Sequence, residues 1–367
     1  MKYLVSTILL LLSISLCGCK TGDSAEKVPF LQIGEFAINR VSDELTIVRD
    51  GAGRSLALIP RGAKAPKGFA PHMIIRVPVQ RVVAYGGFDV AALRVLGVLD
   101  DTLVGVTKAK EKWFVDDVKR GFDDGRIAFI GDATAINYEL LKQQHPELVL
   151  TWDPSVIPML STLNIPCIIT STPVAMCLNA RMSYVKFLAP FFNREQQAED
   201  FFQKVSNSLK DIRRTTEGQW DKTKVMWGDM YEKRVLVEPG NAWIGELVGL
   251  VDSDYLFEDV YGTSCIEISM ERFLYSGTQA NIYFTYRTPK SGATSKAALA
   301  RLHPLLAKIK PLSPEGKVYA PLPHYGQSGD KLDEIFTEIA AIIHPKLYPN
   351  YQLKYFQELP EVDPKGK

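Results

Sequence analysis

The sequence predicts an α/β protein with two α/β lobes, mainly parallel sheets, one long helix joining the lobes and a β-hairpin in front of them. Short β-branched runs alternate with segments of helical spacing over residues 81–170, and the same alternation returns over residues 224–344. Between these halves, apolar residues recur at helical spacing over residues 180–216. The length of 367 residues also suits two lobes better than one. A layered two-lobe architecture follows.

Residues 1–18 have the pattern of an export signal. Lys2 precedes a continuous apolar run that is too short to span a bilayer comfortably and stops at Gly18. Gly18 followed by Cys19 resembles the lipobox of bacterial lipoproteins, which implies removal of the signal and lipidation of Cys19. The alternative is an ordinary secretory peptide with chance cysteines. Residues 19–75 are then predicted to form a polar tether and the hairpin, whose strands at 36–48 and 55–59 flank Arg49-Asp50-Gly51.

The first lobe is predicted over residues 76–180. Asn137 has the side chain and the position of a helix N-cap. The expected strands lie at 81–85, 103–107, 127–130, 148–151 and 166–170, and the expected helices at 88–96, 138–144 and 156–163.

The linking helix is predicted over residues 181–221, with an interruption near 190–194 around Pro190. The second lobe follows over residues 222–350, and residues 351–367 are predicted to be a tail. Its expected strands lie at 224–227, 234–237, 282–285 and 317–320, and its helices begin at 243, 269 and 331.

Composition excludes some classes of function. Lys and Arg total 43 against 42 Asp and Glu, so the chain lacks the positive charge of a nucleic-acid-binding protein. Cys167, Cys177 and Cys265 cannot all pair, and buried thiol roles are favoured over a single disulfide. The sequence has no CxxC or HExxH spacing, so we expect no protein-built metal site and no resident cofactor.

One block of sequence resembles a known family. Residues 131–150, GDATAINYELLKQQHPELVL, are similar to a block of the periplasmic binding proteins that serve ABC importers of iron chelates, haem and cobalamin, the class III family with a helical backbone. The ending at 344–349, HPKLYP, resembles Bacteroidetes-type members. Further similar pieces lie at 77–83, 96–106, 187–211, 244–256 and 268–273.

The resemblance implies a monomeric, lipid-anchored substrate-binding protein in the periplasm, and not an enzyme. Such a protein would hold an iron–siderophore-type chelate between its lobes and deliver it to ABC permease subunits. Haem or cobalamin on the same fold is the alternative ligand. Two readings of other classes are a lipid-anchored hydrolase or metalloenzyme, and an adhesion lipoprotein with an empty cleft. The chain has neither a GxSxG elbow nor a glycine-rich phosphate loop, which counts against the first.

Ligands of open α/β sheets bind beyond the carboxyl ends of the strands, and this rule selects the candidate site. Aromatic side chains offer flat walls to a bulky chelate, and Arg287 would complement an anionic complex or a propionate. Axial ligation of haem would fall to Met230, Tyr231, His324 or Tyr325. The full candidate set is Tyr85, Gly86, Gly87, Trp152, Met230, Tyr231, Trp243, Arg287 and Tyr325.

Glu139 and Glu271 occupy corresponding places, one in each lobe. Each lies in the first turn of a predicted helix, where the helix dipole alone favours a carboxylate. The resemblance implies a second role, as the acidic residues that pair with arginines on the permease. Exposed complementary charges suit such reversible docking.

Overall fold

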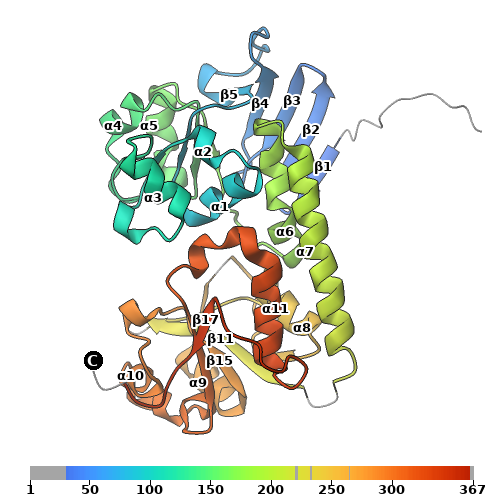
Figure 1. The fold of residues 1–367 in the computed structure, drawn as a ribbon, viewed down its shortest axis with the longest axis vertical. Helices are drawn as coiled ribbons and strands as arrows, with labels where there is room; N and C mark the ends of the chain where they lie inside the picture. Colours follow the sequence, from blue (N-terminus) through green and yellow to red (C-terminus); the bar gives the residue numbers. More distant parts are fainter. Residues whose placement is uncertain (1–29, 220–221, 232–233, 264, 364–367) are drawn as a thin grey trace, which may run out of the picture.

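The computed structural model describes residues 30–219, 222–231, 234–263 and 265–363. The predicted signal, Cys19 and the tether lie outside the described residues. Figure 1 shows two lobes stacked along the long axis, with a separate sheet beside the upper lobe and α7 (Glu195–Thr216) running from one lobe to the other. The predicted two-lobe α/β architecture is confirmed.

The N-terminal segment forms a five-stranded sheet, which is more than the predicted hairpin. Its strands are β1 (Phe30–Ile33), β2 (Phe36–Ser42), β3 (Leu45–Arg49), β4 (Ser55–Pro60) and β5 (Ile74–Val77). The predicted hairpin is β3 and β4. The sequence predicts one strand over residues 36–48, whereas the chain turns at 43–44. The alternation of side chains continues through the turn, so the sequence pattern does not reveal it.

The hairpin turn joins this sheet to the first lobe. The buried carboxylate of Asp50 accepts hydrogen bonds from the backbone of Ala52 and Arg54 and from the Arg54 guanidinium. It also accepts from the backbone N–H of Ile169 at 3.1 Å, and Gly51 donates to the Ile169 carbonyl at 2.9 Å. A Cβ at Gly51 would lie 1.9 Å from the Ser171 carbonyl, so this close approach requires glycine.

The first lobe has an all-parallel sheet in the order β10-β9-β6-β7-β8. The side chain of Asn137 accepts from the backbone N–H of Glu139 and Leu140, which confirms the predicted N-cap. The sequence pattern missed α3, because its polar segment buries only Val118 and Gly121. The elements are β6 (Val82–Ala84), α1 (Gly87–Val95), α2 (Leu99–Thr102), β7 (Leu103–Val106), α3 (Asp116–Asp123), β8 (Ala128–Phe129), α4 (Tyr138–Gln143), β9 (Leu148–Thr151), α5 (Ile157–Thr162) and β10 (Cys167–Ile169).

Two consecutive helices connect the lobes. α6 (Leu178–Leu188) and the 22-residue α7 are separated by a short turn at Pro190, as the interrupted apolar pattern predicts. Leu178 and Met182 pack into the hydrophobic core of the second lobe, whereas Tyr184 and Phe187 pack into that of the first. α6 therefore belongs to both cores, which limits how freely the lobes can move relative to each other.

The second lobe has a mixed sheet in the order β14-β12-β11-β15-β16-β17, with β13 beside β11. β11, β13, β15 and β16 are parallel, whereas β12, β14 and β17 run antiparallel to their neighbours. The elements are β11 (Lys224–Tyr231), β12 (Arg234–Val237), α8 (Trp243–Leu250), β13 (Asp254–Tyr255), β14 (Ile266–Ile268), α9 (Met270–Gln279), β15 (Ile282–Phe284), α10 (Lys296–Ala300), β16 (Lys317–Pro321), α11 (Leu332–Ile343) and β17 (Phe356–Glu358).

Residues 351–363 are part of the second lobe, which corrects the prediction of a tail. Phe356 is buried in the core, and β17 pairs with β16. The carboxylate of Glu338 on α11 accepts the backbone N–H groups of Lys354, Tyr355 and Phe356 at 2.7–2.8 Å. A three-residue strand held partly by a side chain carries too little periodicity for the sequence pattern to reveal it.

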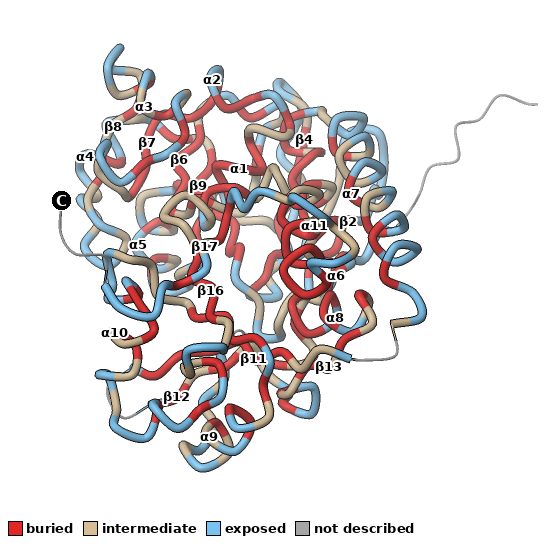
Figure 2. Tube along the Cα trace, turned by 60° about the horizontal axis from the view of Figure 1, so that its bottom comes forward, coloured by how far each residue is buried: buried red, intermediate tan, exposed pale blue. Residues whose placement is uncertain are grey.

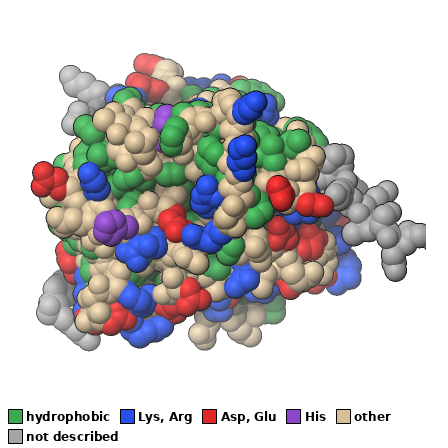
Figure 3. Space-filling view, turned by 90° about the horizontal axis from the view of Figure 1, so that it is seen from above, with side chains coloured by type: hydrophobic (Ala, Val, Ile, Leu, Met, Phe, Trp, Pro, Cys, Tyr) green, Lys and Arg blue, Asp and Glu red, His purple; other side chains and the backbone are tan. Residues whose placement is uncertain are grey.

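The buried residues concentrate in the strands and on the inward faces of the helices (Figure 2). Seen from above, the molecule shows Lys, Arg, Asp and Glu interspersed among apolar side chains (Figure 3). None of the described helices is long and apolar enough to cross a membrane.

Candidate ligand site between the lobes

The two lobes touch where α1 faces the loop at residues 322–330. The side-chain amide of Gln327 accepts from the backbone N–H of Phe114 and donates to the Lys112 carbonyl, both at 2.8 Å. Arg94 on α1 forms an ion pair with Asp330 at 3.0 Å. These residues form an inter-lobe contact that fixes the spacing of the strand ends on either side.

Gly86 and Gly87 follow β6 and meet different neighbours. A Cβ at Gly87 would lie 2.8 Å from the Gly326 carbonyl, so Gly87 allows the two backbones to approach closely. A Cβ at Gly86 would lie 3.9 Å from the indole of Trp152. Trp152 is 45% exposed, and its carbonyl accepts from the Ser171 hydroxyl at 2.6 Å. Gly86 and Trp152 thus share one surface, whereas Gly87 belongs to the contact between the lobes.

Tyr85 lies beneath that surface. Its ring is 1% exposed in a core of the first lobe, and its hydroxyl has no hydrogen-bond partner among the described residues. Burial raises the pKa of Tyr85, and the nearby Tyr138 and Asp153 add to the effect. The side chain is enclosed in this structure, so Tyr85 could support the site only from behind.

Arg287, Tyr231 and Met230 come together at the end of β11. The Arg287 guanidinium donates to the buried Asp229 carboxylate at 3.1 Å and to the Ser291 and Met230 carbonyls. It lies 4.6 Å from the centre of the half-exposed Tyr231 ring. Met230 is 2% exposed and packs in the core. Arg287 is therefore held firmly in place, and Tyr231 is the exposed aromatic beside it.

A third cluster spans the lobes and centres on Arg181, which the strand-end rule does not select because it lies on α6. The Arg181 guanidinium lies over the rings of Phe88 and Trp243, at 4.0 and 5.6 Å from their centres. Phe88 also stacks on Tyr184 at 4.7 Å, and Trp243 packs against Phe336 at 5.6 Å. In the sequence, an arginine between the apolar positions Leu178, Met182 and Val185 was the signal that could have revealed it.

Tyr325 and Glu238 are the polar neighbours of Arg181. The half-buried Tyr325 ring packs 4.9 Å from Phe356. Burial raises the pKa of Tyr325 and that of the Glu238 carboxyl, although Arg181 opposes both effects. Burial likewise lowers the pKa of Arg181, against the pull of Tyr325 and Glu238. The cluster is therefore poorly solvated, and charges within it interact strongly.

The four side chains proposed as axial haem ligands differ in availability. Met230 is in the core, whereas Tyr231, His324 and Tyr325 have part of their surface exposed. Nε2 of His324 lies 2.9 Å from the Lys354 carbonyl. The described residues contain no group of three or more His, Cys, Asp or Glu side chains that could hold a metal ion. Cys167, Cys177 and Cys265 are unpaired thiols.

Glu139 and Glu271 are both exposed, one on each lobe, on α4 and α9 (Figure 1). Each lies two residues after an N-cap, Asn137 or Ser269, whose side chain accepts a backbone N–H. Neither carboxylate forms an ion pair with a cation among the described residues. The two positions are thus alike in local structure and open to a partner.

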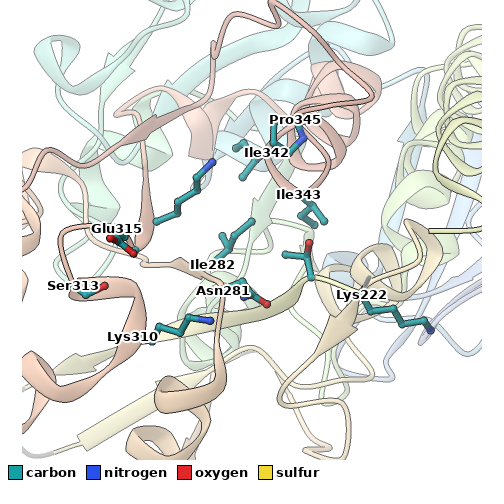
Figure 4. Close-up of a pocket in the computed structure, with 12 residues that line it drawn as sticks. Lys222, Asn281, Ile282, Lys310, Ser313, Glu315, Ile342, Ile343 and Pro345 are labelled. Carbon is teal, nitrogen blue, oxygen red and sulfur yellow. The ribbon is translucent and has the colours of Figure 1, made fainter. Parts of the chain in front are cut away.

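A separate cavity of about 560 Å³ lies in the second lobe, at the opposite ends of its strands (Figure 4). It is lined by the starts of β15 and β16, by Lys222, Lys310 and Glu315, and by the end of α11. Its position at the amino ends of these strands separates it from the candidate site.

A family model of periplasmic binding proteins matches residues 82–320. The chain belongs to this family of periplasmic binding proteins. The matched region begins at β6 and ends within β16, so it contains α6, α7 and the strand ends of both lobes. The N-terminal five-stranded sheet and β17 lie outside it.

Similar proteins agree with this assignment. An uncharacterized lipoprotein of Methanocaldococcus jannaschii is 24% identical over 81% of this chain and 73% of its own length. A periplasmic haem-binding protein from Pseudomonas aeruginosa has a similar structure, with a TM-score of 0.58, 18% identity and coverage of 78% of this chain and 100% of the other. Helicobacter pylori CeuE with Ni(II) bound gives 0.56 and 20%, over 76% and 88%. The structural similarities show that this periplasmic binding protein shares their fold.

Proposed function

We propose that this protein is the lipid-anchored substrate-binding protein of an ABC importer and captures an iron–siderophore-type chelate between its lobes. The observation that carries the proposal is the meeting of both lobes around aromatic and cationic side chains on a periplasmic binding protein fold. We take the protein to be a monomeric carrier and not an enzyme.

The chelate would rest against side chains from both lobes. Trp152 offers an exposed indole from the first lobe, and Trp243, Tyr231 and Tyr325 offer rings from the second. Arg287 would interact with negative charge at the rim, since its ion pair with Asp229 holds it in position. A few placed charges among apolar walls are typical of small-molecule sites.

Haem or cobalamin on the same fold is the alternative ligand. Haem is favoured between these two because the structurally similar protein from Pseudomonas aeruginosa is described as a haem-binding protein. Of the predicted axial ligands, Tyr231, His324 and Tyr325 have exposed surface, whereas Met230 is buried. A phenolate oxygen is a known axial donor to haem iron, so either tyrosine would serve.

Delivery would use Glu139 and Glu271. Both are exposed, lie on different lobes and have no described partner, as a reversible docking contact with permease arginines requires. Cys19 would carry the lipid that keeps the protein at the membrane surface on the periplasmic side. Two or more acyl chains acting together give stable membrane attachment. Because Cys19 would carry this attachment, its loss should release the protein from the membrane.

Titration of tryptophan fluorescence tests the proposal. A ferric tris-catecholate, ferric citrate, haem and cobalamin are added separately to the purified protein, and we expect saturable quenching by one of them. Trp243→Leu should weaken that binding by about 1–3 kcal/mol, the range for losing an aromatic contact at the centre of an interface. The wild-type protein binding none of the four would contradict the proposal.

A further inference from the structure

Arg181 is a cation placed where both lobes can reach it. Its guanidinium lies between Phe88 of the first lobe and Trp243 of the second, on the helix that packs into both hydrophobic cores. Trp243 is tied to the same segment, because its backbone N–H donates to the Met176 carbonyl at 2.9 Å. A group bound to Arg181 would therefore lie close to the place where both lobes meet the helix that joins them.

The positive charge of Arg181 is not neutralised within the described part of the chain. Its Nε atom is buried without a hydrogen-bond partner there, and the guanidinium forms no ion pair within 4 Å with a described carboxylate. Glu238 influences Arg181 only from a longer distance. Arg287 shows the contrast, since three of its N–H groups already donate to protein oxygens. Leaving a poorly solvated cation unpaired is costly, which makes a missing anionic partner the simplest explanation.

We infer that Arg181 recognises an oxyanion of the ligand, a carboxylate or a catecholate, and that the protein therefore selects anionic chelates over neutral ones. This inference rests on the proposed function and adds a residue and a ligand charge to it. The guanidinium contacts the two rings, and its buried Nε has no hydrogen-bond acceptor among the described residues. A planar oxyanion would supply acceptors for paired guanidinium N–H groups. Because Arg181 is poorly solvated, its hydrogen bonds to an anion are strengthened. A neutral ligand group beside it would leave the positive charge unpaired, which is unfavourable.

The test compares chelates that differ in charge, using wild type and three variants. Ferric citrate and a ferric tris-catecholate are the anionic probes, a ferric trihydroxamate is the neutral one, and haem is compared with its dimethyl ester. Arg181→Gln removes the charge, Arg181→Lys keeps charge without the planar fork, and Arg214→Gln on the exposed face of α7 is the matched control. Thermal unfolding of each variant establishes that it is folded.

We expect wild type to bind an anionic probe at least about tenfold more tightly than the neutral probes. In Arg181→Gln the affinity for the anionic probe should fall to that level, whereas the affinity for the neutral probes should stay unchanged. Arg181→Lys should retain part of the wild-type difference, and Arg214→Gln all of it. Equal weakening of both kinds of probe in Arg181→Gln would assign Arg181 a structural role and overturn the inference, as would unchanged binding. Wild type that prefers the neutral probes also overturns it while leaving the proposed function intact. Binding of no probe by wild type removes both.

Discussion

Gly87→Ala should introduce a steric clash between the two lobes. The added Cβ would lie 2.8 Å from the Gly326 carbonyl oxygen and 2.8 Å from Cγ of Gln327, both well inside van der Waals contact. The carbonyl is backbone, so the clash cannot be removed by rotating a side chain. Gly87 is the first residue of α1 with ordinary helical geometry, so alanine itself is acceptable there.

The size of the effect follows from what must give way. Overpacking of this kind costs about 1–3 kcal/mol. Moving the lobes apart to relieve it would break the two Gln327 hydrogen bonds and the ion pair between Arg94 and Asp330, each worth about 1 kcal/mol or less. The cost of tolerating the clash and the cost of breaking these contacts are comparable. Opening the contact between the lobes therefore relieves the clash at little extra cost, and we expect the lobes to separate. The midpoint of urea unfolding should fall, and small-angle X-ray scattering should show a larger radius of gyration.

Gly326→Ala is the matched control, because a Cβ at Gly326 has nothing within 4 Å. It adds the same methyl group on the other side of the same contact, and both measurements should stay at wild-type values. The reasoning is refuted if Gly87→Ala matches wild type in both measurements, or if the two variants change them equally.

Three further predictions use other parts of the molecule. Asp229→Asn leaves the Arg287 cation buried without its partner and should lower the free energy of unfolding by about 3–5 kcal/mol in urea denaturation; a loss below about 1 kcal/mol would contradict this. Burial raises the pKa of Asp89 to about 7, against hydrogen bonds from Tyr184 and Thr170, whereas the unfolded value is about 4. Between these values the native state retains a proton that the unfolded state releases, so stability falls as pH rises from about 4 to 7, by at most about 1.4 kcal/mol per unit. The difference in free energy of unfolding between wild type and Asp89→Asn should show this slope and flatten above pH 7; a constant difference would argue against it. Glu139→Arg with Glu271→Arg should abolish uptake in cells while chelate affinity of the purified protein stays unchanged; weakened affinity would place these residues at the ligand.

The sequence predicted the elements with strong periodicity. The parallel strands of the first lobe and the helix pair broken at Pro190 follow from β-branched runs and from apolar residues at helical spacing. The sequence pattern predicts only a hairpin in place of the N-terminal five-stranded sheet, and it does not predict β17. These strands depend on tertiary contacts, such as those of Asp50 and Glu338 with distant backbone N–H groups. Local patterns do not record such contacts.

For the candidate site, the strand-end rule was partly sufficient. It selected Trp152, Tyr231 and Arg287, which the structure places near the ends of their strands. It could not tell that the side chains of Tyr85 and Met230 turn into cores, since residues that alternate along a strand end face opposite sides. It also passed over Arg181, which reaches the space between the lobes from a helix.

The visible absorption spectrum and metal content of the protein isolated from its native envelope test the central claim most directly. Ferric chelates, haem and cobalamin all absorb visible light, and a carrier purified without denaturation should retain part of its ligand. We expect a coloured protein with iron, or cobalt for cobalamin, approaching one equivalent. The colour should be lost when the protein is unfolded, separated from the released ligand and refolded. Protein that is colourless and metal-free when isolated, and that stays so after incubation with all these chelates, would contradict the claim.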